Sequence, residues 1–221
     1  YDAWFLENRN VLYSEVNLLA SVLSGAGRIL SVGCGSGLFE KILRDEYSID
    51  IHDGIEPSEP MAEIARRRGM SVTVATAEEA DFGKQIYDTI LFNGTPSYID
   101  GLEEVVRKVY EALPRGGRII LVDVPKESSY GLLYNLAKAL GTWDHELLKG
   151  CHPANPYPIE FVNVARWRTS AEKIQMLEKA GFKDLTFAQT LTAHPLYSDN
   201  TAEQPTEGFD RGDYVAISAI K

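Results

Sequence analysis

The sequence predicts a doubly wound α/β fold: one mostly parallel, seven-stranded sheet with helices on both faces and one antiparallel edge strand. The stretch 28–43 reads as a strand, a glycine turn and a helix. Further apolar, strand-like runs then alternate with amphipathic helical patterns, as in consecutive βαβ units. The last two strand-like runs, 182–191 and 213–220, have no helical pattern between them. That final pair predicts the antiparallel edge strand.

The composition is that of an ordinary globular protein. The chain has 221 residues, 44% hydrophobic and 24% charged, and we expect a single domain over residues 1–221. The formal net charge of −10 argues against a broad nucleic-acid surface, which needs clustered Lys and Arg. No uninterrupted apolar run approaches the ~18 residues of a membrane span. We therefore expect a cytoplasmic monomer or homodimer that binds neither nucleic acid nor membrane.

The N-terminal stretch 1–27 predicts a helical segment that precedes the first strand. Its apolar residues recur at helical spacing, which predicts one buried face. That face comprises Leu12, Val16, Leu19 and Leu23. Before it lies an aromatic cluster of Tyr1, Trp4 and Phe5. These rings either pack the helix on the sheet or form a lid over a ligand.

The glycine turn is the strongest signal for a ligand. Gly33, Gly35 and Gly37 alternate directly after an apolar strand, which permits a tight turn and a close approach of the backbone to a ligand. The next helix begins there and directs free N–H groups at the same place. A dinucleotide fingerprint requires a further glycine where this chain has Leu38. Cys34 lies inside the turn, and we expect it to be structural.

An acidic residue follows at the distance that a ribose site requires. Glu56 ends the apolar run 49–55, 19 positions after Gly37, and a carboxylate there can accept hydrogen bonds from both ribose hydroxyls. The turn and this acid resemble motif I and the ribose-binding residue of the class I S-adenosylmethionine-dependent methyltransferases. The similarity is to the small-molecule enzymes of the ubiquinone/menaquinone-biosynthesis type. It implies a Rossmann-like methyltransferase fold and S-adenosylmethionine as cofactor, with S-adenosylhomocysteine as product.

Other segments carry the same resemblance. Tyr-Asp-x-Trp-Phe at the N-terminus is similar to a family segment that closes over the cofactor, and Leu-Pro-x-Gly-Gly at 113–117 is a further hallmark. The resemblance covers residues 1–124 well and 166–221 more loosely. It implies a set of cofactor-binding residues: Tyr13, Gly33, Cys34, Gly35, Gly37, Glu56, Pro57, Met61, Thr76, Ala77, Glu78, Asn93, Gly94 and Thr95.

Some of these residues have a second interpretation. Thr76 departs from the family, which commonly has an Asp here that reaches the adenine, whereas the resemblance still implies the Ala77 backbone contact. Glu78 either substitutes for that Asp or is a solvated residue. Met61 lies against the adenine or belongs to the core. Asn93 and its neighbours 94–98 follow the fourth strand and face the cofactor or form a plain turn.

The remaining elements follow from local patterns. An apolar stripe over 102–113 predicts a helix, residues 118–124 predict the fifth strand, and 130–140 predict another helix. Thr169 and Glu172 form a capping box for a helix that ends at Gly181.

Two segments are longer than the fold requires, the insert 125–168 and the loop 192–212. Both follow the fifth strand, so we expect them to cap an acceptor pocket. The pocket lining that we predict is Trp143, Tyr157, Phe161 and Tyr197. The candidates for a catalytic base are His145, His152 and Tyr98. We expect no metal site, because the His and Cys spacing matches no zinc pattern.

The function predicted from these features is methyl transfer from S-adenosylmethionine to a small-molecule acceptor. Such a reaction depends mainly on proximity and in-line orientation, because the donor carbon is already activated. The alternative is a non-catalytic module or subunit that binds S-adenosylmethionine or S-adenosylhomocysteine. Thr76 favours that alternative, whereas the glycine turn and Glu56 argue against it. A nicotinamide oxidoreductase is the third hypothesis, opposed by Leu38.

Overall fold

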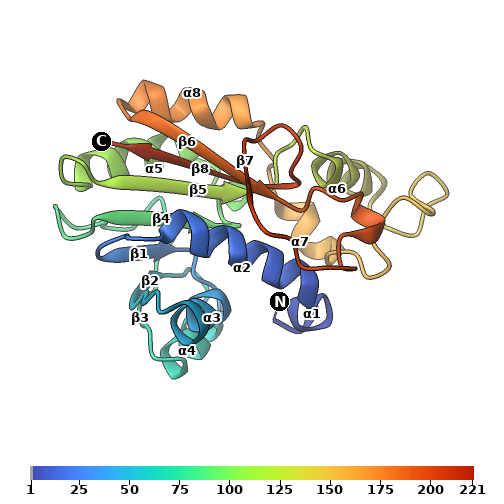
Figure 1. The fold of residues 1–221 in the computed structure, drawn as a ribbon, viewed down its shortest axis with the longest axis horizontal. Coiled ribbons are helices and arrows are strands. Elements are labelled where there is room, and N and C mark those ends of the chain that lie inside the picture. The colour runs from blue at the N-terminus through green and yellow to red at the C-terminus, as the bar shows by residue number, and fades with distance from the viewer. Residues whose placement is uncertain (1) are drawn as a thin grey trace.

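The protein forms one eight-stranded sheet with helices on both faces (Figure 1). The computed structural model describes residues 2–221. The strand order is β3-β2-β1-β4-β5-β8-β6-β7. The strands are β1 (Ile29–Val32), β2 (Asp53–Ile55), β3 (Ser71–Thr73), β4 (Thr89–Asn93), β5 (Arg118–Asp123), β6 (Lys183–Thr190), β7 (Thr206–Glu207) and β8 (Tyr214–Ile220).

The helices connect these strands in the order that the sequence predicts. They are α1 (Asp2–Glu7), α2 (Arg9–Leu23), α3 (Leu38–Tyr47), α4 (Glu59–Arg67), α5 (Leu102–Ala112), α6 (Ser129–Leu140), α7 (Ile159–Val164) and α8 (Ser170–Ala180), with short 3₁₀ turns η1 (Pro96–Tyr98) and η2 (Pro195–Tyr197). Figure 1 shows α6, α7 and the segment between them at the same end of the sheet as α1. Helix α7 has no counterpart among the predicted elements.

The predicted sheet is confirmed, with one strand more than expected. Strands β1 to β5 pair in parallel. The antiparallel strand β8 lies inside the sheet, between β5 and β6, and the antiparallel edge strand is β7. Strand β7 has only two residues, which is too short to leave a periodic pattern in the sequence. The order of strands reverses between β1 and β4, which is where ligands bind in open α/β sheets.

Alternate residues of each central strand enter two different cores. Ile90 and Phe92 of β4 face a cluster that includes α5 and α8, whereas Leu91 faces a cluster that includes α2 and α3. All four residues of the predicted apolar face of α2 are buried. Because both faces are covered, β4 and β5 carry continuous apolar runs in their middle, Ile90 to Phe92 and Ile119 to Val122.

The long loop 192–212 is fastened to α2. The Asp199 carboxylate accepts hydrogen bonds from the backbone N–H groups of Asn10 (2.8 Å) and Val11 (3.0 Å), in the first turn of α2. It therefore caps a helix that is distant in the sequence. Further along, the Ser14 hydroxyl accepts a hydrogen bond from the Glu203 N–H at 2.8 Å.

None of the helices in residues 2–221 has both the length and the apolarity to cross a membrane.

The capping box that begins α8 has the predicted geometry. The Thr169 hydroxyl accepts from the Glu172 N–H at 3.1 Å, and the Glu172 carboxylate accepts from the Thr169 N–H at 2.7 Å.

Helix α8 also carries Lys173, which is 1% exposed. Its ammonium lies 3.7 Å from the buried carboxylate of Asp123, the last residue of β5. This ion pair fixes α8 against the end of the sheet.

Replacing Lys173 with Met should destabilise the fold strongly, because it leaves the Asp123 carboxylate buried without its cation. We expect a loss of about 3–5 kcal/mol in the free energy of unfolding, measured by urea denaturation. The matched control is Lys179→Met on the same helix, whose ion pair with Glu103 is exposed and should contribute less than about 1 kcal/mol. Equal effects of the two substitutions would contradict a structural role for the buried pair.

Candidate cofactor and acceptor site

The glycine turn after β1 has the conformation that its three glycines permit. Gly33, Gly35 and Gly37 have φ values of +71°, +56° and +70°, a region that other residues enter at a cost. A Cβ on Gly33 would lie 2.4 Å from the Thr95 side chain. The backbone N–H groups of Gly33 and Cys34 both donate to the Ile55 carbonyl, at 2.7 and 3.1 Å. The turn is thereby held against the end of β2.

Glu56 joins this turn to the start of α4. One carboxylate oxygen accepts from the Gly35 N–H and the other from the Ser58 N–H, each at 2.9 Å. The residue is 8% exposed. A carboxylate offers about four acceptor positions, so two remain for the hydroxyls of a ribose. The turn, the start of α3 and Glu56 therefore fit an adenosyl cofactor.

Helix α1 is fastened to the same turn. The Ser36 hydroxyl donates to one oxygen of the Asp2 carboxylate (2.5 Å), and the Arg68 guanidinium donates to the other (2.7 Å). The guanidinium also donates to the Ser36 carbonyl at 2.9 Å. These contacts hold α1 beside the glycine turn, as a lid would be. The interpretation of Tyr1 as part of the aromatic cluster lies outside the described residues.

The loop after β4 brings three predicted residues next to the turn. The Thr95 hydroxyl lies 3.0 Å from the carbonyls of both Val32 and Asn93 and donates to them. The Asn93 side-chain oxygen accepts from the Tyr214 hydroxyl at 2.8 Å. Gly94, between them, has a φ of +64°. The loop is therefore packed on the glycine turn through Thr95.

The predicted adenine-side residues are near the ends of β2 and β3, with their polar groups engaged locally. The Thr76 hydroxyl accepts from the Glu79 N–H at 3.3 Å, and Glu78 accepts from the Gly101 N–H at 3.3 Å. Ala77 is buried, Met61 is half-buried and Pro57 is exposed. The contacts of Thr76 and Glu78 with the adenine remain predictions.

Tyr13 lies apart from this group. Its hydroxyl donates to Glu46 at 2.9 Å, and Glu46 is in the last turn of α3, whereas the glycine turn precedes the first. The sequence pattern could not show this, because the direction of Tyr13 depends on how α2 packs across α3.

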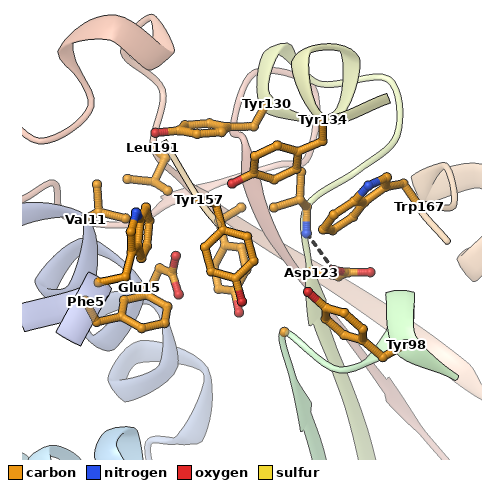
Figure 2. A pocket seen from close by; sticks show the side chains of 14 residues that line it. Phe5, Val11, Glu15, Tyr98, Asp123, Tyr130, Tyr134, Tyr157, Trp167 and Leu191 are labelled. Atoms are coloured by element: carbon orange, nitrogen blue, oxygen red, sulfur yellow. Dashed lines mark hydrogen bonds between the residues drawn. The ribbon is translucent and has the colours of Figure 1, made fainter. Parts of the chain in front are cut away.

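An aromatic cavity opens beside the loop after β4 (Figure 2). Its empty volume is about 560 Å³, open mouth included. It lies at the carboxyl ends of β4 and β5 and extends to α1, α2 and α6. Its lining consists of Trp4, Phe5, Val11, Glu15, Gly94, Tyr98, Asp123, Val124, Tyr130, Tyr134, Tyr157, Trp167, Leu191 and Tyr214.

The rings of this cavity are held by hydrogen bonds to groups around it. The Trp4 indole N–H lies 3.1 Å from the carbonyls of Asn155 and Pro156 and donates to them. The Trp143 indole N–H donates to the Tyr157 carbonyl at 2.8 Å. The Tyr130 hydroxyl pairs with the Ser198 hydroxyl at 2.6 Å. The aromatic walls are therefore preorganised.

The two long segments contribute to the cavity unequally. The insert 125–168 supplies several of its rings, including Tyr157. Of the other predicted lining residues, Phe161 packs on Tyr157 and Trp143 packs on Tyr134, whereas Tyr197 is exposed. No residue of the loop 192–212 is among the lining residues. That loop borders the cavity through Ser198. Its residues 199–203 bond to α2, and its residues 206–212 bond to β6.

The two histidine candidates for a base lie outside the cavity. His145 is exposed, and its ring nitrogen accepts from the Leu147 N–H at 3.2 Å. His152 contacts the Pro153 carbonyl at 2.6 Å. Tyr98 does line the cavity, but burial raises its pKa to about 12 even though 39% of its surface is exposed. The phenol is therefore a weak acid and not a ready base at neutral pH.

Two buried carboxyls of the cavity were not predicted from the sequence. Asp123 accepts from the Ser97 hydroxyl (2.6 Å) and the Val124 N–H (2.9 Å), besides its pairing with Lys173. Glu15 is 7% exposed. The sequence does contain a sign that Glu15 is buried. This residue lies three residues after Leu12 and four before Leu19, on the apolar face of α2.

Burial changes the titration of groups in both halves of the site. It raises the pKa of Glu15 to about 8. It also raises the pKa of the Cys34 thiol, with the nearby Glu40 and Glu56 carboxylates adding to the effect. Cys34 is therefore a neutral thiol at physiological pH, which agrees with a structural role in the turn.

Glu15→Gln should change how stability depends on pH. The folded-state pKa of Glu15 is above its ordinary value of 4.5. Its contribution to the free energy of unfolding is therefore largest below pH 4.5 and is lost as the pH rises toward about 8. Across that range the free energy of unfolding of the variant, relative to that of the wild type, should rise by on the order of 1 kcal/mol per pH unit. Urea unfolding of both proteins at pH 5 and pH 8 measures this. Parallel pH dependence would show that Glu15 is ionised in the fold.

Comparisons with known proteins agree with this geometry. A family model described as a methyltransferase domain matches residues 5–186. A crystal structure from Thermotoga maritima, described as a S-adenosylmethionine-dependent methyltransferase and possible histamine N-methyltransferase, superposes with a TM-score of 0.83. It is 31% identical and matches 100% of this chain and 94% of that one.

Two further proteins are similar in sequence, over different lengths of this chain. An uncharacterized protein of Methanocaldococcus jannaschii is 29% identical over 221 residues, which is 100% of this chain and 95% of the relative. A malonyl-[acyl-carrier protein] O-methyltransferase of Priestia megaterium is 24% identical over 125 residues, 54% of this chain and 45% of that enzyme. The glycine turn with its acid, the cavity beside it and these matches lead to one conclusion: the chain belongs to the methyltransferase domain family and is a S-adenosylmethionine-dependent methyltransferase.

Proposed function

We propose that the protein transfers the methyl group of S-adenosylmethionine to a small-molecule acceptor bound in the aromatic cavity. The observation that carries this proposal is the position of Gly94. This residue belongs to the loop packed on the glycine turn through Thr95, and it also lines the cavity. The cavity therefore adjoins the predicted cofactor site at the carboxyl ends of β1 and β4.

The lining of the cavity supports a small acceptor. It consists mainly of aromatic and aliphatic side chains with a few polar groups, which is typical of small-molecule pockets. The Thermotoga maritima relative is described as a possible histamine N-methyltransferase, and histamine is a small molecule. The net charge of −10 opposes a polyanionic acceptor such as RNA or DNA.

We assign the cofactor to the glycine turn and its neighbours. Glu56 would bind the ribose hydroxyls, the turn 33–37 would contact the methionine part, and Asn93 with Gly94 would border the methyl group. The cofactor supplies an activated methyl carbon. The chain's own part is to hold donor and acceptor in line, to exclude water with α1, and to fix the acceptor between rigid rings.

The first test is ligand stabilisation. S-adenosylhomocysteine should raise the melting temperature, because a ligand at 100 times its dissociation constant adds about 2.7 kcal/mol to the free energy of unfolding. NAD should have no such effect, since Leu38 replaces the third glycine of the dinucleotide turn. Differential scanning fluorimetry with each ligand measures both. Stabilisation by NAD alone would overturn the cofactor assignment.

The second test is Glu56→Ala. The substitution should weaken S-adenosylhomocysteine binding by about tenfold or more, because hydrogen bonds to a charged carboxylate contribute about 1.5–3 kcal/mol each. Isothermal titration calorimetry measures the affinity. The matched control is Glu59→Ala, three residues later, which is exposed and pairs with Arg66. An unchanged affinity of the Glu56 variant would move the ribose site elsewhere.

A further inference from the structure

Glu15 is the one lining carboxyl of the cavity that lacks a compensating partner among residues 2–221. It comes from the middle of α2 and is 7% exposed. No hydrogen-bond donor of the described chain lies within bonding distance of its carboxyl, and no Lys, Arg or His is among the residues that line the cavity. A well-packed apolar side chain would be more stable in this position, because an unpaired buried carboxyl is costly.

The second carboxyl of the cavity differs in this respect. Asp123 has the Lys173 ammonium at 3.7 Å and accepts two hydrogen bonds, from Ser97 and from its neighbour Val124. The negative charge of Asp123 is therefore already compensated by Lys173 within the fold. Figure 2 shows Glu15 and Asp123 on different sides of the Tyr157 ring. Glu15 is therefore the carboxyl of the cavity that is available to a positive group, and it becomes ionised when it pairs with one.

The surroundings of Glu15 also suit a cation. The rings of Trp4 and Tyr157 meet nearly at right angles, with centroids 5.0 Å apart and an interplanar angle of 83°. The Tyr134 ring lies 6.2 Å from the Tyr157 ring and is tilted by 41°. All three rings belong to the cavity lining, and the faces of such rings attract Lys-like and quaternary ammonium groups.

Alternative occupants fit these observations less well. A carboxylate or phosphate ligand would meet Glu15 without a basic residue to bind it. A wholly apolar ligand would leave the carboxyl buried and unpaired. A neutral alcohol can bond to Glu15 but gains nothing from the ring faces. The combination of one unpaired carboxyl and several ring faces is specific for a positively charged group.

We propose that the acceptor carries a basic amine and that Glu15 pairs with this amine, as ammonium, inside the aromatic cavity. This proposal rests on the proposed function, since it names the chemical class of the acceptor in the same site. In this role Glu15 sets specificity: it selects an amine over a neutral or acidic molecule of the same shape. The ammonium of the ligand then supplies the positive charge that no lining residue of the cavity provides to Glu15.

The test compares amines with neutral molecules of the same shape in the presence of S-adenosylhomocysteine. The probes are 2-phenylethylamine and cyclohexylamine, each against the corresponding alcohol, 2-phenylethanol and cyclohexanol. Isothermal titration calorimetry should give at least about tenfold tighter binding of each amine by the wild type. In Glu15→Gln, which keeps the shape and removes the charge, this preference should disappear while S-adenosylhomocysteine affinity is unchanged.

The matched control is Glu7→Gln, which removes an exposed carboxylate of α1 near the cavity. It should keep the preference for amines. The proposal is overturned if the wild type binds both alcohols as tightly as the amines, or if Glu15→Gln retains the preference. A failure of the proposed function would show differently, as a loss of S-adenosylhomocysteine binding in the wild type before any amine is added.

Discussion

The buried Asp123 carboxylate is the group on which the acceptor half of the structure depends. It stands at the end of β5, where the parallel strands meet the inserted segment, and it joins β5 to two other elements: η1 through Ser97 and α8 through Lys173. Arg168 completes the arrangement from the other side, since its guanidinium donates to the carbonyls of Pro96 and Ile99, both at 2.7 Å. Each charge is costly when isolated, so the partners are held in one geometry.

This constraint explains how a cavity persists at the end of a well-packed sheet. Residues of the two hydrophobic clusters fill the faces of the sheet, but beyond the carboxyl ends of the strands the chain must close over irregular backbone. The rings of α1, α6 and the insert provide that closure. The indole groups of Trp4 and Trp143 bond to backbone carbonyls, and the Tyr130 hydroxyl bonds to Ser198. Rigid rings cannot collapse to fill the remaining space, because their positions are fixed from outside the cavity.

Helix α1 connects the two halves of the site. Its Asp2 is bound to the glycine turn through Ser36 and Arg68, while its Trp4 and Phe5 line the cavity. The Phe5 ring also packs against Phe39 of α3, with centroids 5.0 Å apart. The glycine turn and the cavity wall are therefore joined through α1. Such coupling suits an enzyme that must bring a donor and an acceptor together.

The sequence by itself determined the order of elements, the glycine turn, the buried face of α2 and the methyltransferase resemblance. Each of these depends on the spacing of residues close together in the chain and on residue types that suit a particular backbone geometry. Tertiary structure alone decided which polar side chains share a cavity. Tyr13 and Glu15 are two residues apart, yet one reaches α3 and the other enters the acceptor cavity. Likewise the histidines that stood out in the sequence lie outside the cavity, whereas Asp123 and Tyr134 line it. Local patterns state which face of a helix is buried, but only the packing of distant elements fixes what that face meets.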